Sequence, residues 1–153
     1  MPKVIDSFEG KYAFLSNFYD SPFIGNIDEI EYPTVEHYFQ AQKSLSLQER
    51  RMIAAAPTPG KAKYFGRHVD LRPDWEFKKL KVMKYALKRK FDTYPDLKKQ
   101  LLATDDAILI EGNTWHDNFW GDCSCQKCKN IAGKNNLGKL LMMLRAEYRE
   151  EEK

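Results

Sequence analysis

The stretch YPTVEHYFQAQK, Tyr32 to Lys43, begins like a helix but carries an unusual stripe of polar residues. If Thr34 caps the helix, Glu36, Gln40 and Lys43 stand at i, i+4 and i+7 and share one narrow face. The apolar positions of the stretch point to the opposite side, so periodicity alone favours a solvated stripe. The alternative is a pocket wall that holds a substrate.

The pocket alternative rests on what borders the stripe. Phe39 lies beside Glu36 and Lys43, and an exposed aromatic ring next to a carboxylate and an amine is typical of a binding site. These two groups suit sugar chemistry, because a carboxylic acid can move protons and a deprotonated amine can attack an anomeric carbon. The sequence leaves both interpretations open.

Working outward from this stretch, most of the chain reads as helix. Residues 12–32 are rich in aromatic residues and broken by Pro22 and Gly25, which predicts short extended pieces and a hairpin. Apolar residues 107–111 predict a buried strand. We therefore expect an α+β fold: a single compact, mainly α-helical domain over residues 1–153 with a few short strands. Helices are expected from Ser46 to about Ala55, from Thr58 to Gly66, from Asp74 to Phe91, from Thr93 to Ala103, and from Leu137 to a charged tail at 150–153.

The whole-chain figures exclude several classes of protein. At 153 residues and 42% hydrophobic composition, the chain is long enough for one core, and its formal charge of +3 is too small to indicate nucleic-acid binding by itself. No segment has the roughly 18 consecutive apolar residues of a membrane span, and the start lacks a secretory signal. The three cysteines crowd into Cys123–Cys128, which does not fit a disulfide framework. We expect a cytoplasmic protein with no membrane partner.

Two aromatic segments could recognise a substrate. FLSNFY, Phe14–Tyr19, could stack on a planar base and hydrogen-bond its edge, or it could be core aromatics around a turn. NTWHDNFWGD, Asn113–Asp122, follows the predicted buried strand, where loops often carry functional groups. In this loop a tryptophan would stack on a base or sugar, and Asp117 would serve as acid, base or hydroxyl anchor.

Three further segments have a functional and a simpler interpretation. The spacing of Cys123, Cys125 and Cys128 could bind zinc if His116, Asp122 or another group completed the set of four ligands, but it lacks a second Cys/His pair, so free thiols are favoured. GKNNLG, Gly133–Gly138, could bind an anion at a helix start or simply cap that helix. Residues 78–90 hold seven basic residues, as a solvated helix face or a weak polyanion patch would.

Taken together, these motifs resemble the YbiA-like NADAR family. The matching segments, from about residue 14 to 145, are FLSNFY, YPTVEHYFQAQK, GRHVDLRPDW, Lys90-Phe91, Asp117 to Asp122 and GKNNLGKLLMMLR. The resemblance implies an N-glycosidase that acts on early, 5-phosphoribosylated riboflavin-pathway intermediates and requires no cofactor. Other branches remove ADP-ribose from guanine. The resemblance departs at CSCQKCKNIA, where many relatives carry a short glycine-rich link, and this leaves loop shape, substrate choice and metal dependence open.

The resemblance also supports candidate site residues. Glu36, Lys43 and Asp117 are the predicted catalytic residues, with Lys43 forming an imine or a carboxylate activating water. Among the predicted substrate-binding residues, Asn17, Phe18 and Trp120 would hold the base, and Arg67 and the helix start at Asn135 would hold phosphate. The full predicted substrate-binding set is Ser16, Asn17, Phe18, Gln40, Arg67, Trp120, Gly121, Asn135 and Gly138.

Three function classes follow from this reading. The first is an N-glycosidase for a small phosphoribosyl substrate, which small size and modest charge favour. The second is an ADP-ribosyl hydrolase, for which modified nucleic acid would be the alternative substrate. The third is a silent binding module for ADP-ribose-like ligands, against which the intact Glu36, Lys43 and Asp117 argue.

Overall fold

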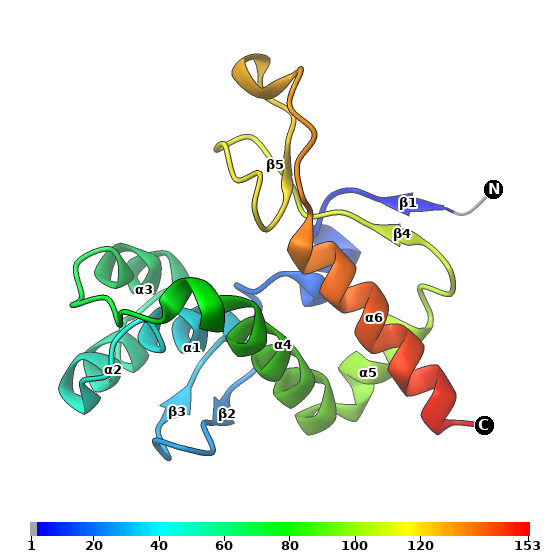
Figure 1. Ribbon diagram of the computed structural model, residues 1–153. Coiled ribbons are helices and arrows are strands. Elements are labelled where there is room, and N and C mark those ends of the chain that lie inside the picture. The colour runs from blue at the N-terminus through cyan, green and yellow to red at the C-terminus, as the bar shows by residue number, and fades with distance from the viewer. Residues whose placement is uncertain (1–2) are drawn as a thin grey trace. The chain divides into compact units, whose positions relative to one another are not determined.

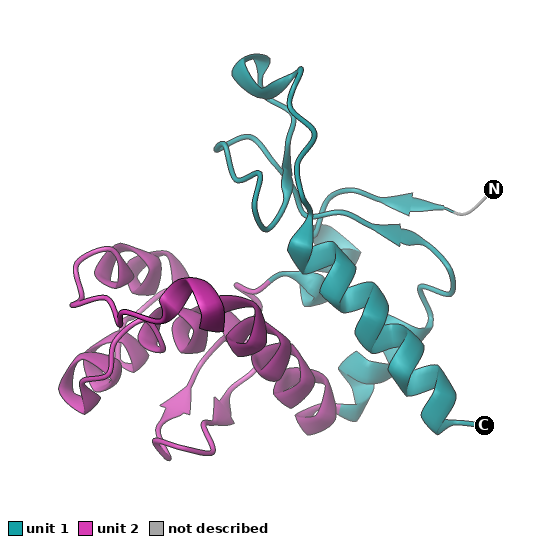
Figure 2. Cartoon of the chain, viewed as in Figure 1, with its two compact units in different colours: residues 1–16, 95–153 teal, residues 17–94 magenta. Residues whose placement is uncertain are grey.

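The computed structural model describes residues 3–153, and the chain divides into two compact units. Unit 1 contains residues 3–16 and 95–153, and unit 2 contains residues 17–94 (Figure 2). Helices dominate and the strands are short, so the predicted α+β, mainly helical class is confirmed. Compact units of this kind also occur within single domains, so the expected single domain stays a prediction.

Unit 2 is a small group of helices with one hairpin. Thr34, Ser46 and Thr58 cap their helices as predicted, because each side chain accepts a hydrogen bond from the backbone N–H three residues later. The predicted hairpin is also present, as an antiparallel pair with Phe23 opposite Tyr32. The elements are β2 (Phe23–Ile24), β3 (Glu31–Tyr32), α1 (Val35–Ala41), α2 (Leu47–Ala54), α3 (Pro59–Gly66) and α4 (Trp75–Thr93).

The short helix α1 lies in the middle of unit 2. It packs against α2, α3 and α4, and all of its residues are buried (Figure 1). The prediction that the polar stripe faces solvent is therefore wrong. A helical wheel assumes one covered face, whereas a helix of two turns between three neighbours has no free face. Phe39, expected to be exposed, is buried as well.

The apolar face of α4 is largely buried, whereas its basic face is not fully solvated. Trp75, Met83 and Phe91 are buried, but Asp74 makes no capping bond and pairs instead with Arg72 at 2.6 Å. Lys90, which the sequence placed among solvated lysines, is 0% exposed. No described helix is long and apolar enough to cross a membrane.

Unit 1 holds the remaining strands and the last helix. The strand predicted at 107–111 is present only at Ile108–Leu109, where Leu109 is buried as expected but Ile108 is exposed. It pairs in parallel with a strand that periodicity did not reveal, with Val4 opposite Ile108. The final helix continues into the first half of the expected tail and ends at Glu151. The elements are β1 (Val4–Ile5), η1 (Gly10–Leu15), α5 (Pro95–Leu102), β4 (Ile108–Leu109), β5 (Gly112–Asn113), β6 (Asp122–Cys123), η2 (Gln126–Cys128) and α6 (Asn136–Glu151).

Helix α6 packs on β4 and α5, and a glycine permits its close approach to β4. A Cβ atom on Gly138 would lie 2.0 Å from the carbonyl oxygen of Leu109, so a larger residue would push the helix away. The segment between β5 and α6 extends from the rest of unit 1 as an arm (Figure 1). Four predicted site residues, Asp117, Trp120, Gly121 and Asn135, lie on this arm.

Candidate functional site

In unit 2 the candidate site is built around a buried carboxylate. Glu36 is 8% exposed and Gln40 is 4% exposed. The Gln40 amide donates a hydrogen bond of 2.6 Å to the Glu36 carboxylate, one helical turn away. A charge-assisted hydrogen bond of this kind orients the carboxylate.

A close contact with α3 holds Gln40 in place. A Cβ atom on Gly66 would lie 2.0 Å from Oε1 and 2.9 Å from Cδ of Gln40, so no larger residue fits there without moving the amide. The sequence predicted that Gly66 ends a helix, and Gly66 is the last residue of α3. Its second role, close packing against the residue that orients Glu36, requires the tertiary structure.

The Lys43 amine lies in an environment that disfavours its charge. Burial is the main cause of its lowered pKa, and the nearby Glu36 carboxylate offsets this only in part. The positive charges of Arg67, Lys63 and Lys79 lower the pKa further. A lysine with a lowered pKa is a better nucleophile at neutral pH, and the surrounding cations suit an anionic substrate.

Aromatic rings line the same part of unit 2. The Lys43 amine lies 6.0 Å from the ring centroid of Phe39, and that ring packs against Trp75 at 5.1 Å. Phe39 therefore borders the stripe as predicted, but as a buried wall.

The predicted base-binding segment meets the start of α1. The backbone carbonyl of Asn17 accepts a hydrogen bond of 3.1 Å from the N–H of Glu36. The Asn17 side chain is buried, whereas Phe18 is exposed. Among residues 3–153, the side-chain oxygens of Asn17 and Gln40 are buried and have no hydrogen-bond partner. A ligand that donates hydrogen bonds to them would account for these two acceptors.

His37 sits in the same helix but has a structural role. Its Nε2 lies 3.0 Å from the carbonyl oxygen of Ala56, and its Nδ1 lies 2.8 Å from the Thr34 hydroxyl. The carbonyl can only accept, so Nε2 carries the proton and Nδ1 accepts from Thr34. This neutral histidine ties α1 to the end of α2.

In unit 1, Asp117 organises the turn that carries Trp120. One carboxylate oxygen accepts hydrogen bonds from the backbone N–H of Phe119 at 3.1 Å and of Trp120 at 2.9 Å. The Asn113 side chain holds the backbone of Asp117: it accepts a hydrogen bond from the Asp117 N–H and donates one to the Asp117 carbonyl. The Trp120 ring packs edge-on against Phe119. The structure thus shows a turn-forming role for Asp117, and its catalytic role stays a prediction.

Hydrogen bonds within unit 1 also engage Asn135 and the start of α6. The Asn135 side chain accepts from the N–H of Glu111 at 2.9 Å and donates to the carbonyl of Leu109 at 2.8 Å. The N–H groups of Asn136 and Leu137 donate to the carbonyls of residues 119 and 120. These bonds use donors that an anion would need, and they favour a positioning role for Asn135.

The remaining predicted residues are described each within its own unit. Gly121 allows close approach, since a Cβ atom there would lie 2.1 Å from the carbonyl oxygen of Glu111. Arg67 is exposed at the end of α3, and Ser16 ends the helix η1. The helix before Ser16 differs from the extended pieces predicted for residues 12–32. The contacts of these three residues with a substrate stay predictions.

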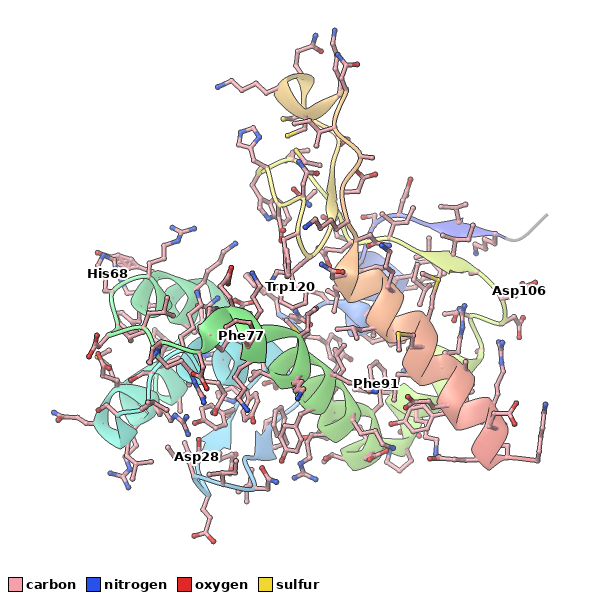
Figure 3. All side chains as sticks on the ribbon, in the orientation of Figure 1. Asp28, His68, Phe77, Phe91, Asp106 and Trp120 are labelled. Atoms are coloured by element: carbon pink, nitrogen blue, oxygen red, sulfur yellow. The ribbon has the colours of Figure 1, made fainter. Side chains whose placement is uncertain are left out.

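Lys90 is a candidate site residue that the sequence analysis did not include. Burial lowers its pKa to about 7, and its amine lies 5.5 Å from the ring centroid of Tyr19 and 5.2 Å from that of Phe91. Its helix places Phe91 next to it in the core (Figure 3). The signal was available: Lys90-Phe91 is one of the motifs shared with the family, although periodicity placed the lysine on a solvated face.

Comparison with known proteins agrees with these motifs. A model of the NADAR domain family matches residues 6–149. The chain is 41% identical over 143 residues to an N-glycosidase of Nostoc punctiforme, covering 90% of this chain and 86% of that protein. It is 42% identical over 138 residues to N-glycosidase YbiA of Escherichia coli, covering 89% and 81%. The NMR structure of E. coli YbiA matches with a TM-score of 0.82 and 39% identity, covering 99% of this chain and 89% of that chain.

A longer relative comes from a plant. The chain is 39% identical over 134 residues to a chloroplastic riboflavin biosynthesis protein, PYRR, of Zea mays, covering 80% of this chain but 20% of that protein. The family match spans nearly the whole chain, and the N-glycosidases of N. punctiforme and E. coli align over 86% and 81% of their own lengths. The chain therefore belongs to the NADAR family and is an enzyme of the N-glycosidase type.

Proposed function

We propose that this enzyme hydrolyses the N-glycosidic bond of phosphoribosylated riboflavin-pathway intermediates of the 5-amino-6-(5-phosphoribosylamino)uracil type, releasing the free base and ribose 5-phosphate. The observation that carries the proposal is the buried Glu36 carboxylate, oriented by Gln40, near a lysine of lowered pKa. The name of the maize relative supports the choice of pathway.

The bond to be broken joins C1 of the ribose to an amine nitrogen. Such an aminal breaks readily once the nitrogen is protonated or the sugar ring opens. Glu36 donates a proton to the leaving nitrogen and afterwards takes one from the attacking water. General acid–base catalysis of this kind contributes roughly 10²- to 10⁴-fold to a rate.

Lys43 offers a covalent route. Its neutral amine adds to C1 of the ring-opened sugar, the base departs with its amine, and an imine joins Lys43 to the ribose. Water then hydrolyses the imine, which returns the lysine and releases the sugar phosphate. In the alternative route Glu36 activates the water directly, and Lys43 contributes only charge.

We infer the substrate contacts in unit 2 from two buried side-chain oxygens without partners and from the positive side chains near Lys43. The side-chain oxygens of Asn17 and Gln40 accept from ribose hydroxyls or from the base, and Arg67 contacts the phosphate. The exposed ring of Phe18 stacks on the base. Trp120 and Asp117 keep their predicted roles as a stacking residue and an acid or hydroxyl anchor.

The direct test is release of base and ribose 5-phosphate from the phosphoribosylaminopyrimidine by purified protein. We expect turnover by the wild type and loss of at least 10²-fold in Lys43→Ala, with Lys99→Ala, an exposed lysine of α5, as the control. Failure of the wild type to turn over this substrate, with the protein folded, would contradict the proposal.

Borohydride separates the two routes. An imine on Lys43 would be reduced to a stable amine, and peptide mass spectrometry would find the sugar phosphate attached to that residue. Trapping on Lys43 supports the covalent route. Full turnover with no adduct would leave the lysine as an electrostatic group and assign water attack to Glu36.

ADP-ribosylated guanine in DNA is the comparison substrate. The basic face of α4 is weaker than its sequence indicates, because Lys90 is buried and Lys88 pairs with Asp92 at 3.3 Å. We therefore expect the small substrate to be preferred. Faster release from the modified DNA, with a steep dependence on salt, would favour the ADP-ribosyl hydrolase alternative.

A further inference from the structure

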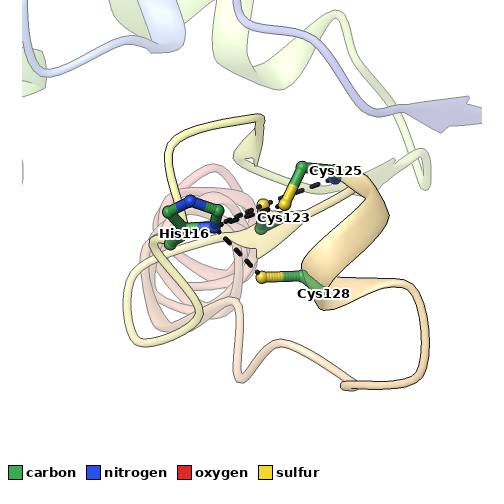
Figure 4. A group of neighbouring side chains, drawn as sticks. All are labelled: His116, Cys123, Cys125 and Cys128. Atoms are coloured by element: carbon green, nitrogen blue, oxygen red, sulfur yellow. Dashed lines mark hydrogen bonds between the residues drawn. The ribbon is translucent and has the colours of Figure 1, made fainter.

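A second cluster of reactive side chains lies on the arm of unit 1, and none of its members belongs to the proposed catalytic or substrate-binding set. It consists of His116, Cys123, Cys125 and Cys128, which come from the loop after β5, from β6 and from η2 (Figure 4). One potential ligand atom from each side chain lies within 4.8 Å of the others. The sequence favoured free thiols because no second Cys/His pair accompanies the three cysteines, although it offered His116 or Asp122 as a fourth ligand.

The fourth ligand is His116, and the distances match a metal site. Nδ1 of His116 lies 3.2 Å from the sulfur of Cys125, 3.5 Å from that of Cys128 and 4.0 Å from that of Cys123. Tetrahedral zinc with bonds of about 2.3 Å to sulfur and about 2.05 Å to nitrogen separates the two kinds of ligand by about 3.6 Å. The three measured distances bracket this value.

Hydrogen bonding alone does not explain the arrangement. In a neutral imidazole, Nδ1 either donates one hydrogen or accepts one, yet three sulfur atoms converge on the same nitrogen (Figure 4). His116 has a backbone φ of 69°, a left-handed conformation that is uncommon for residues other than glycine. A cation at the centre would give all four side chains a common partner.

The surrounding polar groups fit thiolate ligands. The Asn118 amide donates to the sulfur of Cys128 at 3.4 Å, and the backbone N–H of Cys125 donates to the sulfur of Cys123 at 3.5 Å. Asn118 also accepts from the N–H of Cys123 at 2.9 Å. Such outer contacts orient metal ligands and stabilise their negative charge.

The arm also lacks the apolar core that would otherwise fold it. Within residues 112–135 the buried residues are Asn113, Gly121, Cys123 and Cys128, whereas Trp115 and Ile131 are exposed. Segments with so little buried apolar surface commonly depend on a metal or a disulfide. The cysteines are the core of this arm, and all three are free.

We propose that His116, Cys123, Cys125 and Cys128 bind one structural zinc ion. The set of imidazole and thiolates suits zinc, and with four protein ligands the site has no open position for substrate. Binding displaces the three thiol protons, so three thiolates, a neutral imidazole and Zn²⁺ form a centre of net charge −1. The zinc fixes the loop that carries Asp117 and Trp120, and this inference does not depend on the proposed substrate.

The first experiment measures metal in the whole protein purified under reducing conditions without added chelator. We expect zinc equimolar with the chain, and release of that zinc when the thiols are modified. After zinc removal, Co²⁺ should give the ligand-field bands of a tetrahedral site and a thiolate-to-cobalt charge-transfer band. Octahedral Co²⁺ spectra, or no zinc in protein whose thiols are reduced, would overturn the proposal.

Matched variants identify the ligands. His116→Ala should lose zinc, whereas His68→Ala should keep it, because His68 is an exposed residue of unit 2 (Figure 3). Asn118→Ala should weaken zinc binding by about 10- to 100-fold, the range for outer-shell contacts. Cys125→Ser should lose the charge-transfer contribution of one thiolate. Unchanged zinc affinity in His116→Ala would overturn the assignment.

Stability and redox state separate zinc from a disulfide. Zinc removal should increase hydrogen exchange in residues 112–135 and leave that of α1 unchanged. If the thiols instead form a disulfide in the purified protein, and its reduction loosens the arm without any bound zinc, the cluster is a redox pair and the zinc proposal is wrong.

Discussion

Helix α1 and the arm at residues 112–135 both carry candidate functional groups, but they are stabilised in opposite ways. Every residue of α1 is buried, so its polar groups are held by close packing and by buried hydrogen bonds. Few residues of the arm are buried, and it is held by Asn and Asp side chains that bond to backbone groups, together with its cysteine cluster. Substitutions in the first region should therefore act through packing, and those in the second through lost polar ties.

The strongest test of the packed region is Asp28. Its carboxylate accepts from Tyr32 at 2.5 Å and Gln42 at 3.1 Å and pairs with Arg50 at 3.3 Å. Burial opposes its ionisation, but these partners together keep the pKa of Asp28 below its usual value. Asp28→Ala leaves Arg50 as an uncompensated buried charge, so we expect the free energy of unfolding to fall by about 3–5 kcal/mol.

Urea denaturation followed by circular dichroism measures this change. Asp106→Ala is the control, because Asp106 is exposed in unit 1 (Figure 3). Equal stabilities of the two variants would show that the ion pair contributes little to unit 2. Because the folded-state pKa of Asp28 is lowered, its contribution is present above the unfolded pKa of about 3.9 and is lost as the pH falls through the folded value.

The corresponding test of polar ties in unit 1 is Asn135→Gly. Glycine keeps the left-handed backbone of Asn135, with φ at 50°, so the variant removes only the bonds to Glu111 and Leu109. Leaving these backbone groups without partners should lower stability by about 1–3 kcal/mol. Asn136→Ala, at the next position, is the control.

Kinetics of the same variant test its function. If Asn135 positions the helix start, KM for the phosphorylated substrate should change little in protein that remains folded. A large rise in KM at unchanged stability would instead restore Asn135 as a phosphate ligand.

Gly66→Ala tests the contact that holds Gln40. The added methyl group must displace the Gln40 amide, which should destabilise the protein by about 1–3 kcal/mol and misplace the Glu36 carboxylate. We expect activity to fall by about tenfold or more, since small misplacements of catalytic groups have large effects. Gly60→Ala in the same helix is matched, because its nearest atom would lie 3.9 Å away. Equal activities of the two variants would remove the positioning role of Gly66.

The smallest expected effect is the pH response of His37. Burial is the main cause of its lowered pKa, and the Ala56 carbonyl and Asp20 offset this in part. The folded state therefore binds its proton less tightly, so stability is complete above the unfolded pKa of about 6.5 and falls as the pH drops toward the folded value. Denaturation at pH 5 and pH 8 should show a smaller loss in His37→Gln than in the wild type. An identical loss would mean that other groups cause it.

Local signals predicted much of the fold. The Thr34, Ser46 and Thr58 caps and the Gly66 stop mark three helices correctly, because capping depends on residues close in sequence. Strands β1, β5 and β6 were missed, since two residues are too few to show a period of two.

The errors in the site have a common cause. The burial of the Glu36 stripe and of Lys90 follows from neighbouring helices, which no helical wheel contains. The sequence offered His116 and Asp122 as possible fourth ligands of the cysteine cluster but could not choose between them, and the structure brings His116 to the three sulfur atoms. Family motifs pointed to Glu36 and Lys43 where periodicity alone pointed to solvent.

The central claim is that Glu36 catalyses cleavage of the ribosyl C–N bond, and one comparison tests it most directly. Glu36→Gln keeps the size of the side chain but removes its ability to exchange a proton, and Glu31→Gln changes an exposed glutamate of the same unit. We predict that release of free base from the phosphoribosylaminopyrimidine falls by roughly 10²- to 10⁴-fold in Glu36→Gln and is unchanged in Glu31→Gln. Wild-type turnover by folded Glu36→Gln protein would contradict the account.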